Sequence, residues 1–165
     1  MSQFDDKQYQ LETLALRSGH TRSFEGEHAE PIFLTSSFVY DNAAEAAAKF
    51  SGQEEGNIYS RFTNPTVATF EKRIAALEGA DRAVATGSGM AAIMSIVMTF
   101  LKAGDHVLCS RSVFGSTVAL FEKYVSKFGI DVEFVDLTDV SAWEAAVRPE
   151  TKLFFVESPS NPLGD

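Results

Sequence analysis

The second half of the sequence alternates short apolar runs with segments of helical periodicity, and no other feature constrains the fold as strongly. Strands are expected at the apolar runs 83–86, 106–110, 130–135 and 153–157. Helices are expected between them, at 90–101, at 116–128 and from a capping position at Ser141. This β-α-β-α-β-α-β order predicts an α/β fold with a mostly parallel sheet and helices on both of its faces.

The first half is organised differently, with separate helices joined by irregular segments. Helices are expected at 9–18, from Asn42 to about Gly52, and from Asn64 to Gly79, where Pro65 occupies the first helical position. Residues 19–40 have no helical period, and Pro31 followed by an apolar run indicates an extended arm. Residues 53–64 are expected to form a loop.

Charge and cysteine content narrow the classes of function. The formal net charge is −9, and Cys109 is the one cysteine. Because nucleic acids and anionic membranes select clustered basic residues, neither is expected as a partner, although an anionic small molecule can still bind a local site. The three histidines have no metal-ligand spacing to one another or to Cys109, so no metal site is expected.

The sequence also indicates a cytoplasmic protein. One cysteine excludes an internal disulfide framework and fits a reducing compartment. The polar residues 1–10 do not resemble a signal peptide. The most apolar stretch, residues 90–101, is shorter than the roughly 20 residues that a membrane span needs.

Gly87-Ser88-Gly89-Met90 stands between a predicted strand and a predicted helix, where parallel sheets place their ligands. Glycines allow a tight turn and a close approach of the ligand, and the helix start presents free amides to an anion such as phosphate. No Gly-Lys-Ser/Thr follows, so this is not a P-loop. The small residue Ala92 also fits a loose dinucleotide pattern. An NADP site and a turn without ligand therefore remain alternatives.

Three further segments carry side chains suited to a ligand. In an extended segment, Tyr59 and Arg61 point the same way and can grip a phosphate or carboxylate; the alternative is a solvated arginine beside a packing tyrosine. Phe114, beyond the second strand, can stack on a flat ring or simply pack. The proline-stiffened turn after Glu157 fixes Asn161, whose amide can donate to a phenolate-like oxygen; the alternative is a plain turn.

Together, these segments resemble the Cys/Met-metabolism family of pyridoxal-phosphate enzymes, which has the aspartate-aminotransferase fold. The matching segments are Tyr59-x-Arg61-x-x-Asn64-Pro65-Thr66, Gly87-Ser88-Gly89-Met90-Ala91, Phe114-Gly115-Ser116-Thr117 and Glu157-Ser158-Pro159-Ser160-Asn161-Pro162. The resemblance implies a fold type I transferase. Residues 1–64 would be an arm and dimer-contact segment, and residues 65–165 would be the first part of the cofactor-binding α/β domain, which is incomplete.

The resemblance also assigns roles around pyridoxal 5'-phosphate. The amides of Gly89 and Met90 would hold the cofactor phosphate, and Phe114 would stack on the pyridine ring. Asn161 would bond the phenolic oxygen of the ring, with Glu157 just behind it. The same resemblance implies a homo-oligomer, a dimer of dimers.

In that assembly, Tyr59 and Arg61 would reach the phosphate bound by the neighbouring subunit. The arm before Tyr40 would dock on the same neighbour.

The implied reaction is γ-replacement, in which sulfide displaces the acyl group of O-succinylhomoserine, or another O-acylhomoserine, to give homocysteine for methionine biosynthesis. The segment 112–116 favours this branch, although many relatives have Tyr where Phe114 stands here. Cystathionine γ-synthase, γ-lyase and methionine γ-lyase activities are alternatives within the family. An NADP-binding oxidoreductase piece and a non-catalytic module are alternatives outside it.

None of the seven lysines lies in the Ser-x-Thr/Ala-Lys setting of the family's Schiff-base lysine, which is therefore expected downstream. No residue of this chain is thus assigned as catalytic. The 165 residues alone are expected to hold the cofactor weakly or not at all, and to be inactive.

Overall fold

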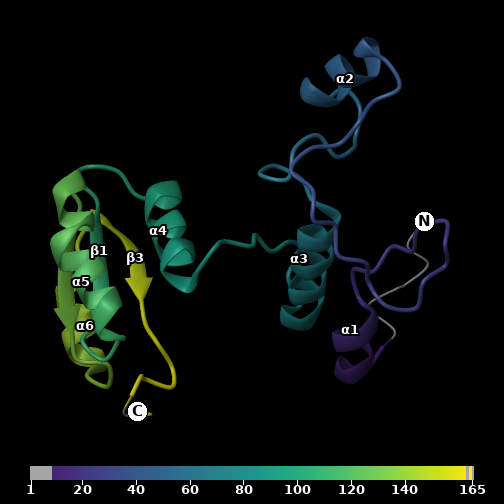
Figure 1. Ribbon diagram of the computed structural model, residues 1–165. Helices are drawn as coiled ribbons and strands as arrows, with labels where there is room; N and C mark the ends of the chain where they lie inside the picture. Colours follow the sequence, from purple (N-terminus) through teal and green to yellow (C-terminus); the bar gives the residue numbers. More distant parts are fainter. Residues whose placement is uncertain (1–8, 163, 165) are drawn as a thin grey trace. The chain divides into compact units, whose positions relative to one another are not determined.

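The structure, a computed structural model, describes residues 9–162 and residue 164 and divides into two compact units, Met1–Ala85 and Thr86–Asp165 (Figure 1). Most of the segment on which the prediction of no signal peptide depends, residues 1–8, lies outside the described residues. The division expected from the sequence falls earlier, between residues 64 and 65. That division concerns the roles of the segments and stays a prediction.

The C-terminal unit is a three-stranded parallel sheet with strand order β2-β1-β3. Its elements in chain order are α4 (Gly89–Phe100), β1 (His106–Ser110), α5 (Gly115–Lys123), the 3-10 helix η2 (Val125–Phe128), β2 (Asp131–Val135), α6 (Val140–Ala146) and β3 (Thr151–Phe155). All five residues of the central strand β1 are buried. This burial explains why its sequence is a nearly continuous apolar run.

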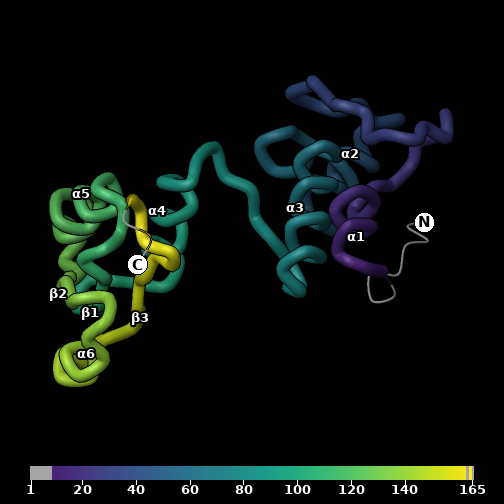
Figure 2. Tube along the Cα trace, turned by 90° about the horizontal axis from the view of Figure 1, so that it is seen from below, coloured from purple at the N-terminus to yellow at the C-terminus, as the bar shows by residue number. Residues whose placement is uncertain are grey.

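Helices cover both faces of the sheet, as predicted. On one face Phe121 of α5 packs edge-on against Phe155 of β3, with 5.4 Å between ring centroids. Phe154, the preceding residue of β3, faces the other way and lies 5.9 Å from the ring of Trp143 in α6. Figure 2 shows β2, β1 and β3 side by side, with α4 and α5 on one side of the sheet and α6 on the other.

The hydrophobic core lies between the sheet and the pair α4 and α5. Its buried members come from α4, β1, α5, η2 and the loops that join them: Val97, Leu101, Val107, Cys109, Val113, Phe121, Val125 and Ile130. Because this core fixes the positions of α4, β1 and α5 together, it also fixes the loops that follow β1 and precede α4.

The strand expected at 83–86 does not form, and the sheet has three strands in the part of the chain that the structure describes. A strand needs a neighbour that satisfies its backbone groups. Here the N–H of Ala85 donates instead to the carboxylate of Glu71 at 2.8 Å. Apolar composition alone therefore did not make this segment a strand.

Three boundaries also differ from the prediction. The helix expected at 116–128 ends at Lys123, and a 3-10 turn closes on Gly129 in the left-handed conformation. α6 begins two residues earlier than expected, because Asp139 rather than Ser141 accepts the capping hydrogen bond from Ala142 at 3.0 Å. The last strand covers 151–155 rather than 153–157.

The N-terminal unit contains α1 (Leu11–Arg17), α2 (Ala43–Phe50) and α3 (Pro65–Glu78), and α1 packs on α3. Both predicted N-caps are confirmed, since Asn42 accepts from the amide of Glu45 and Asn64 from that of Thr66, each at 2.9 Å. Gly79 ends α3 with a φ of 64°. A left-handed C-cap of this kind favours glycine.

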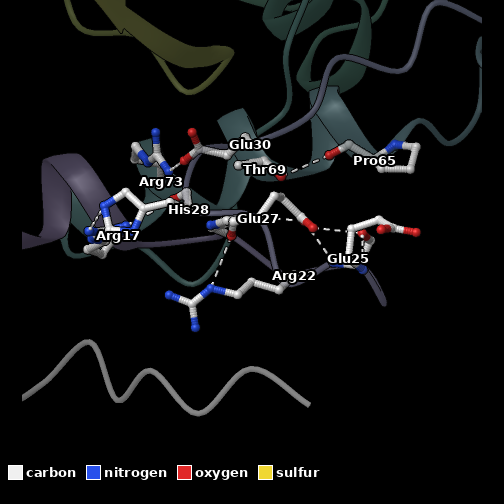
Figure 3. Close-up of polar contacts among 11 residues, drawn as sticks. Arg17, Arg22, Glu25, Glu27, His28, Glu30, Pro65, Thr69 and Arg73 are labelled. Carbon is white, nitrogen blue, oxygen red and sulfur yellow. Dashed lines mark hydrogen bonds and ion pairs between the residues drawn. The ribbon is translucent and has the colours of Figure 1, made fainter.

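Residues 19–40 contain no helix, as predicted for the arm. Side chains of α1 and α3 hold its first part, as Figure 3 shows. Arg17 donates to the carbonyl of His28 at 3.1 Å, and Arg73 donates to the carbonyl of Ser18 at 2.9 Å and pairs with Glu30. Since local periodicity is absent, these long-range contacts determine the course of the arm.

Candidate functional site

A cavity of about 550 Å³ lies where the chain leaves β1 and β3 and enters α4. Its wall brings together residues that the sequence singled out from three separate segments: Gly89, Met90, Phe114, Glu157 and Asn161. This placement agrees with the rule that parallel sheets bind ligands outside the carboxyl ends of their strands. All of these residues belong to the C-terminal unit.

The start of α4 provides anion-binding groups to this cavity. Ser88 is the N-cap, and its hydroxyl oxygen accepts the amide of Ala91 at 3.1 Å. Gly89 and Met90 are the first two helical residues, so their amides have no acceptor within the helix. The helix adds a partial positive charge at the same end. A phosphate at this position would receive both.

The glycines at this turn are not required by backbone conformation. Neither Gly87 nor Gly89 has a positive φ, so other residues could adopt the backbone conformation of this turn. A Cβ added at either position would meet nothing within 4 Å. Because Gly89 also lines the cavity, a side chain there would occupy the space beside the free amides. A group that approaches those amides closely therefore fits the site.

Phe114 lines the cavity and lies in the chain between the core residue Val113 and helix α5. Val113 before it is 5% exposed and packs in the core, whereas Phe114 is 48% exposed. Its backbone N–H donates to the carboxylate of Glu157 at 2.7 Å. Sequence reasoning missed this hydrogen bond, because the partners are 43 residues apart and nothing in the pattern links them.

The turn after β3 presents Asn161 to the cavity. The neighbouring Ser160 is buried, whereas Asn161 is exposed and lines the cavity wall. A side-chain amide at this place can donate to one ligand atom and accept from another. The cavity thus has anion-binding amides, an aromatic ring and an amide side chain on separate parts of its wall.

Tyr59 and Arg61 belong to the N-terminal unit, where the arm orders their segment. Tyr59 forms an antiparallel bridge with Ser37, and the N–H of Ser60 donates to the carbonyl of Ser36 at 2.9 Å. The buried Asn64 donates to the carbonyl of Phe33 and to the hydroxyl of Ser60, both at 3.0 Å.

The side chains of Tyr59 and Arg61 lie against each other. The guanidinium carbon of Arg61 is 5.0 Å from the centroid of the Tyr59 ring and 5.0 Å from that of Phe62. Arg61 also lines a cavity of about 840 Å³ within the N-terminal unit. The planar guanidinium presents its hydrogen-bond donors in one plane, which suits an oxyanion such as phosphate, and its contacts with the two rings restrain its position.

Cys109 is not a candidate nucleophile. It is fully buried in β1, and burial raises the pKa of its thiol to about 12. Among residues 9–162 and 164, no group of His, Cys, Asp and Glu side chains has an arrangement that would hold a metal ion. Within the same residues, no helix is long and apolar enough to cross a membrane.

The sequence profile of the Cys/Met metabolism PLP-dependent enzymes matches residues 12–165. The chain belongs to this family. It is 63% identical over 155 residues to the O-succinylhomoserine sulfhydrylase of Pseudomonas aeruginosa, covering 94% of this chain and 38% of the relative. It is 41% identical over 158 residues to an L-methionine gamma-lyase of Fusobacterium nucleatum, covering 96% and 40% of the two chains. The chain thus spans about two fifths of the length of these relatives.

Solved structures of the family agree with the fold. A putative O-acetylhomoserine (thiol)-lyase of Campylobacter jejuni matches 95% of this chain and 39% of its own with a TM-score of 0.88 and 34% identity. That protein contains N'-pyridoxyl-lysine-5'-monophosphate. The metB protein of Corynebacterium glutamicum matches 98% of this chain and 40% of its own with a TM-score of 0.89 and 31% identity. The fold expected from the sequence, a PLP-dependent transferase domain, is confirmed.

Proposed function

We propose that this chain supplies the phosphate and ring site of an enzyme that replaces the acyl group of an O-acylhomoserine with sulfide, giving homocysteine. The observation that carries the proposal is the cavity of about 550 Å³, which collects five residues predicted from separate segments. In this proposal the amides of Gly89 and Met90 bind the phosphate of pyridoxal 5'-phosphate. Phe114 lies against the ring, Asn161 donates a hydrogen bond to the ring oxygen, and Glu157 lies behind them. When bound, the cofactor supplies an electron sink for negative charge on the substrate carbons.

A second copy of the chain completes the phosphate site in this proposal. Tyr59 and Arg61 are exposed and in contact with each other, so they are available to an anion bound by a neighbouring protomer. The assembly is then a homo-oligomer, and a dimer of dimers is the form we propose. Charge-assisted contacts from arginine would add to those of the α4 amides without competing for the same oxygen atoms.

The substrate that we propose is O-succinylhomoserine. Support comes from the higher identity to the sulfhydrylase of Pseudomonas aeruginosa, 63% against 41% for the methionine gamma-lyase. A γ-lyase activity is the second candidate, since the chain also resembles lyases over nearly all of its length. The buried single cysteine and the small-molecule chemistry fit the cytoplasm, where we place the reaction.

A chimera tests the function. The matching N-terminal region of the Pseudomonas aeruginosa sulfhydrylase is replaced by residues 12–165 of this chain, and the remainder of that enzyme supplies the groups beyond the match. The chimera is assayed for homocysteine from sulfide with O-succinylhomoserine and with O-acetylhomoserine. Keto-acid release from methionine is measured in parallel. We expect homocysteine formation at a rate near that of the parent, with O-succinylhomoserine preferred.

Two further proteins serve as controls for this assay. The 165-residue chain alone is expected to produce no homocysteine. A chimera carrying Arg61→Ala is expected to need more cofactor for half-maximal activity, because it loses a charged phosphate contact. A folded chimera that releases keto acid from methionine and forms no homocysteine would favour the lyase. One that performs neither reaction would refute the proposal.

A further inference from the structure

Phe114 occupies a position for which phenylalanine is poorly suited. It is the N-cap of α5, a helix of nine residues, and it has no side-chain capping hydrogen bond. N-cap positions favour Ser, Thr, Asp and Asn, whose side chains accept a hydrogen bond from the first turn. An aromatic residue at an N-cap therefore leaves the start of the helix without its usual local stabilisation.

Glu157 provides an acceptor from another part of the chain. Its carboxylate oxygen Oε2 accepts the N–H of Phe114 at 2.7 Å. In a capping box, a glutamate three residues into the helix bonds the N-cap amide in the same way. Here Thr117 stands at that helical position, and the glutamate comes from 43 residues downstream. The negative charge also lies near the positive end of α5, which is favourable.

The sheet makes this long-range contact feasible. Cys109 of β1 pairs with Phe155 of β3, so the segments that follow the two strands leave the same edge of the sheet side by side. Glu157 lies just beyond β3, and Phe114 lies just before α5. The buried Val113 and this hydrogen bond both restrain Phe114 on its N-terminal side, and α5 follows directly on its other side.

We propose that Glu157 is a positioning residue, whose carboxylate accepts the backbone N–H of Phe114 as the glutamate of a capping box would and thereby holds Phe114 at the cavity. This inference rests on the proposed function, in which that ring lies against the cofactor. It differs from a direct role, because Glu157 acts on the ligand only through Phe114. Phe114 occupies the N-cap position without a side-chain hydrogen bond to the first turn of α5, and Glu157 fixes the backbone amide of the residue that carries the ring.

Amide hydrogen exchange in the ligand-free 165-residue chain tests the structural half of the proposal. Glu157→Ala is expected to reduce protection of the Phe114 amide roughly tenfold or more, as for loss of a hydrogen bond to a charged group. Glu157→Gln keeps a carbonyl acceptor and should retain most of the protection. Glu144→Ala, at an exposed glutamate on α6 of the same unit, should change nothing at Phe114. Unchanged protection in a folded Glu157→Ala chain would overturn the proposal.

Binding of pyridoxamine 5'-phosphate tests the functional half. This probe lacks the aldehyde that would form Schiff bases with the seven lysines of the chain. Glu157→Ala is expected to weaken binding roughly tenfold in the presence of Phe114, with Glu157→Gln restoring most of the affinity. In a Phe114→Ala background, Glu157→Ala should have no further effect, because its action passes through the ring.

The outcomes separate this inference from the proposed function. If the wild-type chain binds the probe and Glu157→Ala weakens binding equally in both backgrounds, Glu157 acts on the ligand directly or on the unit as a whole. The positioning role is then wrong, and the proposed function stands. If neither the wild-type chain nor the chimera described above binds the probe at millimolar concentration, both are overturned. If Glu157→Ala weakens probe binding only when Phe114 is present, and Glu157→Gln restores it, the positioning role and the proposed function are both supported.

Discussion

Replacement of Gly89 by alanine separates the stability of the fold from its proposed ligand binding. Gly89 has no positive φ, and an added Cβ would meet no atom within 4 Å. Alanine restricts the unfolded chain more than glycine does, so a compatible site gains about 0.4–1 kcal/mol of unfolding free energy. We therefore expect Gly89→Ala to be as stable as the wild type or slightly more stable.

The same methyl group is expected to impair binding. Gly89 lines the cavity next to the first free amides of α4. A Cβ at this place would keep a phosphate from approaching the amides closely. Loss of one hydrogen bond to a charged group costs about 1.5–3 kcal/mol, which corresponds to a roughly 10- to 150-fold lower affinity. Stability and affinity are thus predicted to change in opposite directions.

Thermal unfolding by circular dichroism measures the first effect, and titration with pyridoxamine 5'-phosphate measures the second. Gly87→Ala is the matched control, because a Cβ there also meets nothing within 4 Å. Gly87 does not line the cavity in the described structure, so its alanine variant should keep its affinity and be as stable as the wild type or slightly more stable. A Gly89→Ala chain that binds the probe as tightly as the wild type, or that loses more than about 1 kcal/mol of stability, would refute this reasoning.

Three further predictions address other parts of the chain. Burial raises the pKa of Cys109 to about 12, so the folded chain at pH 8 should react with iodoacetamide far more slowly than the chain in urea, as mass spectrometry would show; equal rates would contradict the burial. Hydrogen bonds from the hydroxyl and backbone N–H of Ser23 lower the pKa of Glu27 from 4.5 to about 2. Its contribution to stability is therefore present above pH 4.5 and lost as the pH falls through about 2, and a carboxyl carbon titration by NMR that gives an ordinary pKa would contradict this contact. Finally, Phe114→Asn should be more stable than Phe114→Ala by about 1 kcal/mol in thermal unfolding, because asparagine caps α5 and alanine does not; equal stabilities would argue against the N-cap assignment.

Local signals in the sequence predicted most of the secondary structure. Asn42, Asn64 and Gly79 mark helix ends through their own side chain or backbone preference, and the structure confirms each of them. β1 was also predicted with the correct bounds, because a strand buried on both faces has an unusually apolar sequence. Signals of this kind depend on only a few neighbouring residues.

The failures have a common physical origin in contacts between distant residues. The segment 83–86 has the composition of a strand, but the amide of Ala85 bonds to Glu71 of α3. The hydrogen bond between Phe114 and Glu157 likewise joins segments that only the pairing of β1 with β3 brings together. Phe114, Glu157 and Asn161 could be predicted because they follow β1 and β3 of one parallel sheet. Gly89 and Met90 could be predicted from the helix start that they form, although the strand expected before them is absent from the described sheet. The hydrogen bond between Phe114 and Glu157, which orients Phe114, could not be predicted in this way.

The central claim is that the first amides of α4 hold a phosphate, and NMR titration of the 165-residue chain tests it most directly. The ¹H–¹⁵N signals of Gly89 and Met90 are followed while pyridoxamine 5'-phosphate is added, and the titration is repeated with pyridoxamine, which has no phosphate. We predict that both amides shift downfield with the phosphorylated compound and stay in place with the other. If neither amide responds to the phosphate in this chain or in the chimera, or if both compounds shift them equally, the account of this site is contradicted.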